Sequence, residues 1–404
     1  MNKVVVIGMG LSPGDLTAAH LDLIRSADIL MGGRRHLDGF ESLAVQKEVI
    51  TGRIDDAITF IRRHMEQKRI VVLASGDPLF FGIGARISSE LGADRVTIRP
   101  NITSVAAAFA RINLPWSESR IVSLHGRDRK WAVLDALKEG VPVAVLTDHR
   151  HTPGWLAGWL RDRGVFDVKL AVFEQLGMPE EVFGWYGLAE AIERRFARPN
   201  VVILKPDRPR VNPWLGMEDD LFDREKGLIT KAEVRAVTLS KLALRPGQTF
   251  WDLGAGSGSV GIEAAVLLGE GRIVAVEQKS SRVAQIRANA RRQGVFNLDV
   301  VQARLPDGLD GLPGPDRIFI GGGGKNLTAI IAAAAGYLPA GGVMVTNTIL
   351  LDNLTASIDA LEAAGFETGV TQVQISNSKS MPYSRRFEPQ NPVWIITGKM
   401  KAKK

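Results

Sequence analysis

The stretch that most constrains the fold of this chain is Phe250–Gly261, FWDLGAGSGSVG. A short apolar run ends in Asp252, a glycine-rich loop follows, and IEAAVLL then continues with a helical apolar pattern. This order predicts a buried strand, a tight turn and the N-terminus of a helix. Backbone N–H groups at such a helix start point toward a ligand, so the stretch predicts a site for the polar parts of a nucleotide-like molecule.

Length and composition limit the remaining possibilities. A chain of 404 residues exceeds the usual size of a single core, which predicts two domains. The absence of cysteine excludes disulfides, thiolate nucleophiles and cysteine-bound metals, and we expect no metal site. The net charge of +7 suits anionic small molecules, whereas nucleic acid would favour a dense basic stripe with interleaved aromatic residues. We therefore expect no nucleic-acid partner.

The start of the chain and its apolar runs bear on location. Strand-like VVVIG follows Lys3 without the pattern of a signal peptide. No apolar run in the sequence is long enough to span a bilayer. We expect no membrane partner and a cytoplasmic protein.

Strands alternate with helical patterns through the first half, which predicts an α/β domain or a pair of small ones. The predicted strands cover residues 3–8, 28–31, 70–74, 96–98, 121–124, 141–147, 168–173 and 201–204. Loops rich in glycine, proline or polar residues follow four of them, at Gly10–Asp15, Ser75–Phe80, Asn101–Ser104 and Leu124–Gly126. Ligands of parallel sheets bind beyond the carboxyl ends of the strands, so these loops predict a site. Any one of them is equally explained as an ordinary turn.

The first three loops occur in the order found in the tetrapyrrole methylase family, and this half of the chain resembles that family over about residues 3–204. The motifs are GMGLSPGD at Gly8, SGDPLFFG at Ser75 and PNITS at Pro100, where Asn101 replaces the usual glycine and can also adopt φ > 0. The resemblance implies S-adenosylmethionine (SAM) in a cleft between two lobes. By position it implies cofactor contacts at Pro13, Asp77, Phe80, Thr103, Ser104 and Thr147.

Two polar residues at strand ends, His125 and Asp148, are further candidates. Each suits a structural role or the orientation of substrate better than acid–base catalysis.

A proline-rich join follows the first half. Pro206, Pro209 and Pro213 disfavour both helix and central strand, so residues 208–216 are predicted to be a fairly stiff linker between domains 1–207 and 217–404. Three acidic residues come next, and they lack the alternating pattern of a calcium loop. A solvated turn is therefore favoured over a metal site at Asp219, Asp220 and Asp223.

The second half is predicted to hold seven strands, near residues 249–253, 272–277, 298–303, 317–320, 342–347, 369–376 and 392–398. Helical patterns separate the first five, and only a loop, residues 377–391, joins the last two. This order predicts a parallel sheet that ends in an antiparallel hairpin. That arrangement is typical of a Rossmann-like class I methyltransferase, whose last strand is antiparallel.

The glycines at 256, 258 and 261 formally match the dinucleotide motif G-x-G-x-x-G, so NAD must be weighed against SAM. Asp252 at the strand end would repel a pyrophosphate, whereas it suits the ammonium of a methionine moiety, directly or through water. Glu277 ends the next strand, where an acid binds ribose hydroxyls in both kinds of site. Asp252 and the closing hairpin favour SAM.

Further motifs frame this site. Thr230 with Glu233 fits a capping box, with Lys231 and Arg235 facing solvent. Four glycines, Gly321–Gly324, leave room for a bulky ligand beside the cofactor. Together with WDLGAGSGSVGIEAA and VTNTIL, these motifs resemble the decarboxylating precorrin methyltransferases over about residues 217–398. By position the resemblance implies cofactor contacts at Thr230, Gly254, Ala255, Gly256, Ser257, Gly258, Glu277 and Ala303, the last usually a glycine, and Asp252 joins them by the charge argument.

The two halves in this order resemble the fused, bifunctional members of that family. The resemblance implies one SAM per domain, methylation of a polycarboxylate tetrapyrrole at C5 by the first domain, and methylation at C15 with loss of the C12 acetate carboxyl by the second. It also implies a homo-oligomer. Another tetrapyrrole substrate, or a non-catalytic nucleoside-binding assembly protein, stays open. Basic side chains are expected to hold the substrate carboxylates, and the candidates are Lys231, Arg235, Lys325 and His125.

Overall fold

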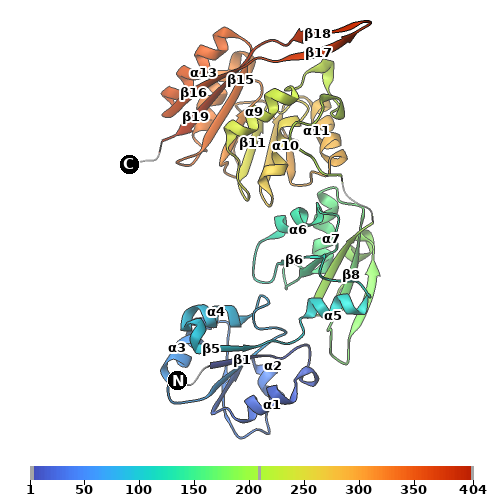
Figure 1. Ribbon diagram of the computed structural model, residues 1–404, viewed down its shortest axis with the longest axis vertical. Coiled ribbons are helices and arrows are strands. Elements are labelled where there is room, and N and C mark those ends of the chain that lie inside the picture. The colour runs from blue at the N-terminus through green and yellow to red at the C-terminus, as the bar shows by residue number, and fades with distance from the viewer. Residues whose placement is uncertain (1–3, 208–210, 402–404) are drawn as a thin grey trace. The chain divides into compact units, whose positions relative to one another are not determined.

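The computed structural model describes residues 4–207 and 211–401, so residues 208–210 of the predicted linker lie outside the described part (Figure 1). The chain forms two compact units. The first comprises Met1–Arg129, Val141–Arg161 and Phe166–Asp207, and the second comprises Lys130–Gly140, Asp162–Val165 and Arg208–Lys404.

The first sheet of unit 1 is entirely parallel, with the strand order β3-β2-β4-β1-β5. Its strands are β1 (Val4–Gly8), β2 (Ile29–Gly32), β3 (Gln46–Val49), β4 (Ile70–Ala74) and β5 (Val96–Arg99). The accompanying helices are α1 (Ala18–Arg25), α2 (Arg34–Asp38), α3 (Ile54–His64), α4 (Ile83–Leu91) and α5 (Ser104–Arg111). All five strands end at one edge, where the glycine loops lie. The sequence prediction missed β3, because this edge strand, QKEV, is charged and shows no apolar alternation.

The second sheet is mixed, with the order β6-β7-β10-β8-β9. Only β6 and β7 run parallel, and β10 lies antiparallel between β7 and β8. The strands are β6 (Arg120–Ser123), β7 (Val143–Leu146), β8 (Val168–Glu174), β9 (Val182–Tyr186) and β10 (Asn200–Pro206). The helices between them are α6 (Lys130–Leu137), α7 (Pro153–Asp162) and α8 (Leu188–Glu193). The prediction missed β9, another edge strand, whose side chains are largely exposed.

Unit 2 contains a seven-stranded sheet with the order β13-β12-β11-β14-β15-β19-β16. The strands are β11 (Thr249–Leu253), β12 (Arg272–Glu277), β13 (Leu298–Gln302), β14 (Arg317–Ile320), β15 (Val343–Thr348), β16 (Phe366–Val373) and β19 (Val393–Met400). The helices are α9 (Ala232–Leu242), α10 (Ser259–Leu268), α11 (Ser280–Arg292), α12 (Leu327–Ala335) and α13 (Leu351–Ala363). The last strand, β19, runs antiparallel to both its neighbours, β15 and β16. The predicted Rossmann-like sheet with an antiparallel last strand is confirmed.

The stretch 377–391 was predicted to be a plain loop, and that prediction is wrong. It forms most of a two-stranded ribbon, β17 (Ser376–Met381) paired with β18 (Ser384–Pro389). Every residue of both strands is exposed, and the ribbon projects beyond the large sheet in Figure 1. Because neither face is buried, the sequence SNSKSM carries no apolar alternation from which a strand could be inferred.

The two faces of the large sheet bury separate cores. Phe250 of β11 packs with residues of α9 and α10, including Ile262, on one face. The adjacent Trp251 packs with residues of α12 and α13, including Ile330, on the other. Because strand side chains alternate, Asp252 shares the face of Phe250 and points toward α10. This placement decides what Asp252 can contact.

Candidate functional site

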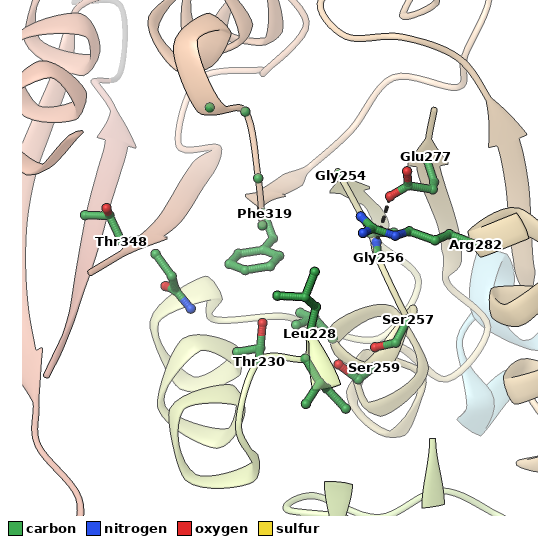
Figure 2. A pocket seen from close by; sticks show the side chains of 18 of the residues that line it. Leu228, Thr230, Gly254, Gly256, Ser257, Ser259, Glu277, Arg282, Phe319 and Thr348 are labelled. Carbon is green, nitrogen blue, oxygen red and sulfur yellow. Dashed lines mark hydrogen bonds between the residues drawn. The ribbon is translucent and has the colours of Figure 1, made fainter. Parts of the chain in front are cut away.

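A pocket of about 820 Å³ opens at the carboxyl edge of the large sheet, which is the size typical of ligand-binding sites. Its walls come from the segments that follow β11, β12, β13, β14 and β15, together with the residues before α9. Figure 2 shows Glu277 and Arg282 beside the glycine loop, with Phe319 and Leu228 further along. The pocket therefore has one end with charged side chains, and another where Phe319 and Leu228 lie beside Thr230 and Thr348.

The glycine loop forms the floor of the polar end, and Gly254, Ala255, Gly256 and Ser257 all line it. The N–H groups of Gly254 and Ala255 both donate to the carbonyl of Val276, at 2.9 and 3.1 Å, which fixes the loop against β12. Gly258 does not line the pocket. It adopts φ +77° before α10, and an added Cβ would lie 2.9 Å from the Ile286 side chain, so its role is to let the turn close.

Glu277 ends β12 and is held toward the loop. Its carboxylate accepts hydrogen bonds from the N–H of Gly256 at 3.1 Å, drawn in Figure 2, and from the N–H of Lys279 at 3.0 Å. Ala303, which also lines the pocket, donates its N–H to the Glu277 backbone carbonyl at 3.2 Å. A carboxylate has further lone pairs to offer, so Glu277 can accept two ribose hydroxyls.

The predicted direct contact between Asp252 and the cofactor is wrong, because the Asp252 side chain does not reach the pocket. Its side chain is 1% exposed and accepts a hydrogen bond from the N–H of Gly261 in α10, at 2.9 Å through Oδ2. Its Oδ1 atom is buried without a partner. Burial raises the pKa of Asp252 to about 7, and the nearby Glu277 charge adds to the effect. The alternation of side chains along β11 aims Asp252 beneath the loop, so a direct contact with a methionine ammonium is excluded in this geometry.

Arg235 was expected at the mouth of the pocket or in solvent, and both expectations are wrong. The side chain is fully buried, and its Nε donates to Glu263 at 2.6 Å. The guanidinium also contacts Asp219 and donates to the carbonyls of Met217 and Thr230. A signal was present in the sequence, since Thr238, Leu239 and Leu242 follow Arg235 at the spacing of one buried helix face.

The capping box predicted at Thr230 is also wrong. The helix α9 begins at Ala232, Lys231 occupies the N-cap position, and no side chain caps it. Thr230 and Lys231 instead line the pocket. The buried guanidinium of Arg235 donates a hydrogen bond to the Thr230 carbonyl. This hydrogen bond, and not a helix cap, therefore sets the position of Thr230.

The other predicted cations and acids differ in their ion-pair partners and in whether they line the pocket. Lys231 is partly exposed and pairs with Asp219 at 3.0 Å. Lys325 is exposed and does not line the pocket. The remaining acids pair with arginines, Asp220 with Arg224 and Asp223 with Arg292. Among residues 4–207 and 211–401, no group of three or more His, Asp and Glu side chains is arranged to hold a metal ion.

Sequence reasoning missed three lining residues of different character: Arg282, Arg304 and Phe319. Arg282 donates to Glu225 at 2.8 Å, and Phe319 is 1% exposed at the centre of the view in Figure 2. Arg304 follows Ala303 directly, so its position after a strand of the sheet was an available signal.

In unit 1 the structure brings the three predicted loops together. Gly10 and Gly76 form a β-bridge, which joins the first loop to the second. The amide of Asn101 donates to the carbonyls of Gly8 and Asp15, at 2.9 and 3.1 Å, which joins the third loop to the first. Asn101 is not among the residues with positive φ, so the turn does not use the φ > 0 conformation that asparagine can adopt. Its side chain serves as a tie that the usual glycine could not provide.

The predicted residues on these loops mostly shape the backbone. Asp77 accepts the N–H of Leu79 at 2.8 Å, and Thr103 caps α5 by accepting the N–H of Ala106 at 3.0 Å. Pro13 opens a short helical turn, Ser104 opens α5, and Phe80 packs on the core beneath the second sheet. These contacts leave backbone groups of the loops to meet a ligand.

The other candidates of unit 1 lie at the ends of β6 and β7. Thr147 is 8% exposed, and its hydroxyl is committed to Asn200 at 2.6 Å. His125 contacts the Thr147 carbonyl through Nδ1 at 3.2 Å. Burial opposes ionisation of Asp148, but the N–H groups of His151, Arg150 and Gly126 outweigh it and hold the pKa of Asp148 well below its usual range. Asp148 is therefore a structural anion that fixes the loop carrying His125.

Similarity to known proteins agrees with both sites. Residues 3–190 match the tetrapyrrole (corrin/porphyrin) methylase family and residues 220–398 match the precorrin methyltransferase domain family. A precorrin-6Y C(5,15)-methyltransferase [decarboxylating] from Sinorhizobium sp. is 34% identical over 351 residues, which are 83% of this chain and 82% of the relative. The chain belongs to the decarboxylating precorrin-6Y C5,15-methyltransferase family.

Shorter relatives match about half of the chain. A probable cobalt-precorrin-6B C(15)-methyltransferase (decarboxylating) from Pyrobaculum calidifontis is 40% identical, covering 45% of this chain and 94% of the relative. The crystal structure of a precorrin-6Y C5,15-methyltransferase from Geobacter metallireducens is 46% identical with a TM-score of 0.45, covering 46% of this chain and 98% of that one.

SAM fits the pocket of unit 2 on its own geometry. Glu277 offers a carboxylate at the strand end, and Gly254 and Gly256 adopt φ +73° and +59°, which brings bare backbone to the cavity. A Cβ at Gly256 would meet no atom within 4 Å and would project into space that a ligand can use. The family consists of SAM-dependent methyltransferases, which agrees with SAM as the ligand of this pocket.

Proposed function

We propose that this chain methylates precorrin-6Y at C5 and C15 and removes CO2 from the C12 acetate, with SAM as the methyl donor, giving precorrin-8 of cobalamin synthesis. The observation that carries the proposal is the pairing of two sites in one chain. The three tied loops of unit 1 and the pocket of unit 2 lie within segments that match two different methylase families, in the order found in the Sinorhizobium relative.

We assign the two methylations to different domains. Residues 1–207 form the domain that methylates C5, and residues 217–404 form the domain that methylates C15 and decarboxylates. Each domain takes one SAM. A relative of about half the length is named for C15 methylation alone, and residues 220–398 match the precorrin methyltransferase domain family, which supports this assignment.

In the second domain the protein contributes positioning. SAM supplies an electrophilic methyl group when bound. Glu277 would accept hydrogen bonds from the ribose hydroxyls, and the loop Gly254–Ser257 would present backbone groups to the rest of the nucleoside. Holding the two reactants in line supplies much of the rate, because the electron-rich ring carbons need little activation.

The part of the pocket around Phe319 suits decarboxylation. Phe319 and Ile330 line it and are almost fully buried, so a carboxylate placed there loses water. The C–CO2 bond then breaks, CO2 leaves, and the electron pair enters the conjugated ring that methylation has made electron-poor. No acid or base on the protein is required for that step.

The experiment that tests the proposal is a mass measurement on the reaction with precorrin-6Y and SAM. The expected product has gained two methyl groups and lost one CO2. An unchanged macrocycle in the presence of bound SAM would rule out this substrate and leave another tetrapyrrole or a non-catalytic binding role. Asp77→Ala, which loosens the turn at Leu79, is expected to impair C5 methylation and spare CO2 release.

Two further predictions concern the protein in the cell. Self-association stays a prediction, which the molar mass in solution tests. Cytoplasmic location also stays a prediction. No helix within residues 4–207 and 211–401 has both the length and the apolar character that crossing a membrane requires.

A further inference from the structure

The pocket of unit 2 is lined by three cations, and two of them already have carboxylate partners. Arg282 donates to Glu225 at 2.8 Å, and Lys231 pairs with Asp219 at 3.0 Å. Arg304 is exposed, and across residues 4–207 and 211–401 the structure shows it no carboxylate partner. A guanidinium that lines a pocket and has no carboxylate partner is suited to bind a carboxylate from outside the protein.

The same pocket has an unusual apolar rim. Leu228 and Ile349 both line the pocket and yet are 59% and 53% exposed. Leu350 and Leu351, at the start of α13, continue the run and are 57% and 66% exposed. Three consecutive exposed aliphatic residues are unfavourable on a surface that contacts only water, so they indicate a binding surface.

Neither feature includes Glu277 or the glycine loop, the groups assigned to the nucleoside, although Arg304 directly follows Ala303. The polar end beside Glu277 and the glycine loop already accounts for a ribose and its attached groups. A ligand that touches both an aliphatic rim and an unpaired guanidinium must have an apolar face and an anionic edge. A tetrapyrrole with carboxylate side chains around its ring has both.

We propose that Leu228 and Ile349 form a shelf for one face of the tetrapyrrole ring, and that Arg304 binds a carboxylate on its edge. The proposal rests on the proposed function and assigns the residues that orient the ring for C15 methylation. Arg304 is thus a specificity-determining residue, which acts on the substrate and not on SAM.

The first test compares Arg304→Ala with Arg245→Ala. Arg245 is a matched control, because it is an exposed arginine before β11 that does not line the pocket. For Arg304→Ala we expect the tetrapyrrole KM of C15 methylation and CO2 release to rise about 10- to 100-fold, the range for a lost charged hydrogen bond. The Kd for SAM is expected to change less than about twofold, and Arg304→Lys should recover part of the loss.

Three results would overturn the assignment of Arg304. They are an unchanged KM in Arg304→Ala, an equal rise in Arg245→Ala, or a parallel loss of SAM affinity. The unchanged SAM affinity also establishes that the variant is folded.

The shelf is tested by Leu228→Ser and Ile349→Ser against Val266→Ser, an exposed apolar residue on α10 that does not line the pocket. We expect each shelf variant to raise the tetrapyrrole KM about 3- to 10-fold and the control to leave it unchanged, since each removes about one buried aliphatic contact. A change in molar mass with an unchanged KM would make these residues a subunit interface and refute the shelf.

Direct binding separates this proposal from the proposed function. Titration of the full chain with uroporphyrin, a stable polycarboxylate tetrapyrrole, is expected to lose one class of sites in Arg304→Ala. If the wild-type chain binds it but converts no precorrin-6Y, the proposed function fails and the shelf stands. If Arg304→Ala binds it as the wild type does, the shelf proposal fails whatever the activity.

Discussion

The two predicted SAM sites are built in opposite ways. In unit 2 the contacts come largely from one continuous loop, Gly254–Ser257, with Glu277 across from it in an 820 Å³ pocket. In unit 1 the site is assembled from three segments far apart in sequence, which the Gly10–Gly76 bridge and the Asn101 amide tie together. A local loop is preformed by its own backbone, whereas a distributed site depends on ties between loops.

This difference predicts how each site fails. A change in the local loop should abolish its site without touching the fold, because the backbone geometry and the ligand contact reside in the same residues. Loss of a hydrogen bond that joins the loops of unit 1 should loosen several loops at once and lower the SAM affinity only in part.

The largest effect is expected for Gly256→Arg. The side chain would start from φ +59° and enter the open pocket, so it should block SAM in unit 2 by more than about 100-fold, by strain and by occupancy. Calorimetry should then find one SAM per chain in place of two, and the product should carry only the C5 methyl. Gly311→Arg is the control, since Gly311 has φ +78°, open space around it and no place in the pocket. A product that still carries a C15 methyl would contradict the division of labour.

Arg235→Met should give the largest loss of stability. It leaves Glu263 buried without its cation, although the N–H groups of Gly216 and Met217 still contact it, and breaking such a pair costs about 3–5 kcal/mol. Denaturant unfolding of unit 2 measures the loss. Arg292→Met, which removes an exposed pair with Asp223, should cost no more than about 1 kcal/mol. Equal losses would show that Arg235 does not anchor the segment under Thr230.

Asp252→Asn should change stability in a manner that depends on pH. Because the pKa of Asp252 is raised to about 7 in the folded chain, the unfolded chain loses this proton first, and the wild type loses stability as pH rises from about 4 through 7. Without SAM, the variant should gain on the order of 4 kcal/mol relative to wild type at pH 8 and little at pH 4, because each unit of the pKa shift is worth about 1.4 kcal/mol. Thermal unfolding at both pH values measures this, and a gain that is independent of pH would show that Asp252 is not protonated in the fold.

Asn101→Ala should have the smallest effect, and it tests the distributed site. Loss of the two hydrogen bonds to Gly8 and Asp15 should weaken unit 1 by about 1–2 kcal/mol and lower C5 methylation roughly 10-fold. Release of CO2 from the same chain is the internal control and should not change. If C5 methylation survives intact, the loops of unit 1 are held by the backbone bridge alone.

Much of the fold was accessible from local patterns. The strand–loop–helix at Phe250–Gly261, the seven-stranded sheet and its antiparallel last strand follow from apolar periodicity, which the structure confirms. The edge strands β3 and β9 and the ribbon β17–β18 were missed, because strands without a buried face need no apolar alternation.

The sequence alone determined the residue types of both sites and the order of the two domains, because glycine loops and strand-end acids are local features. Only the tertiary structure decided the direction and environment of each side chain. Asp252 lies beneath the loop since β11 aims it at α10, Arg235 is an internal anchor since its helix face is buried, and Arg304 is the pocket cation without a described carboxylate partner. Which side chains are buried, and which groups they contact, depends on segments distant in the chain, so no local sequence pattern could predict it.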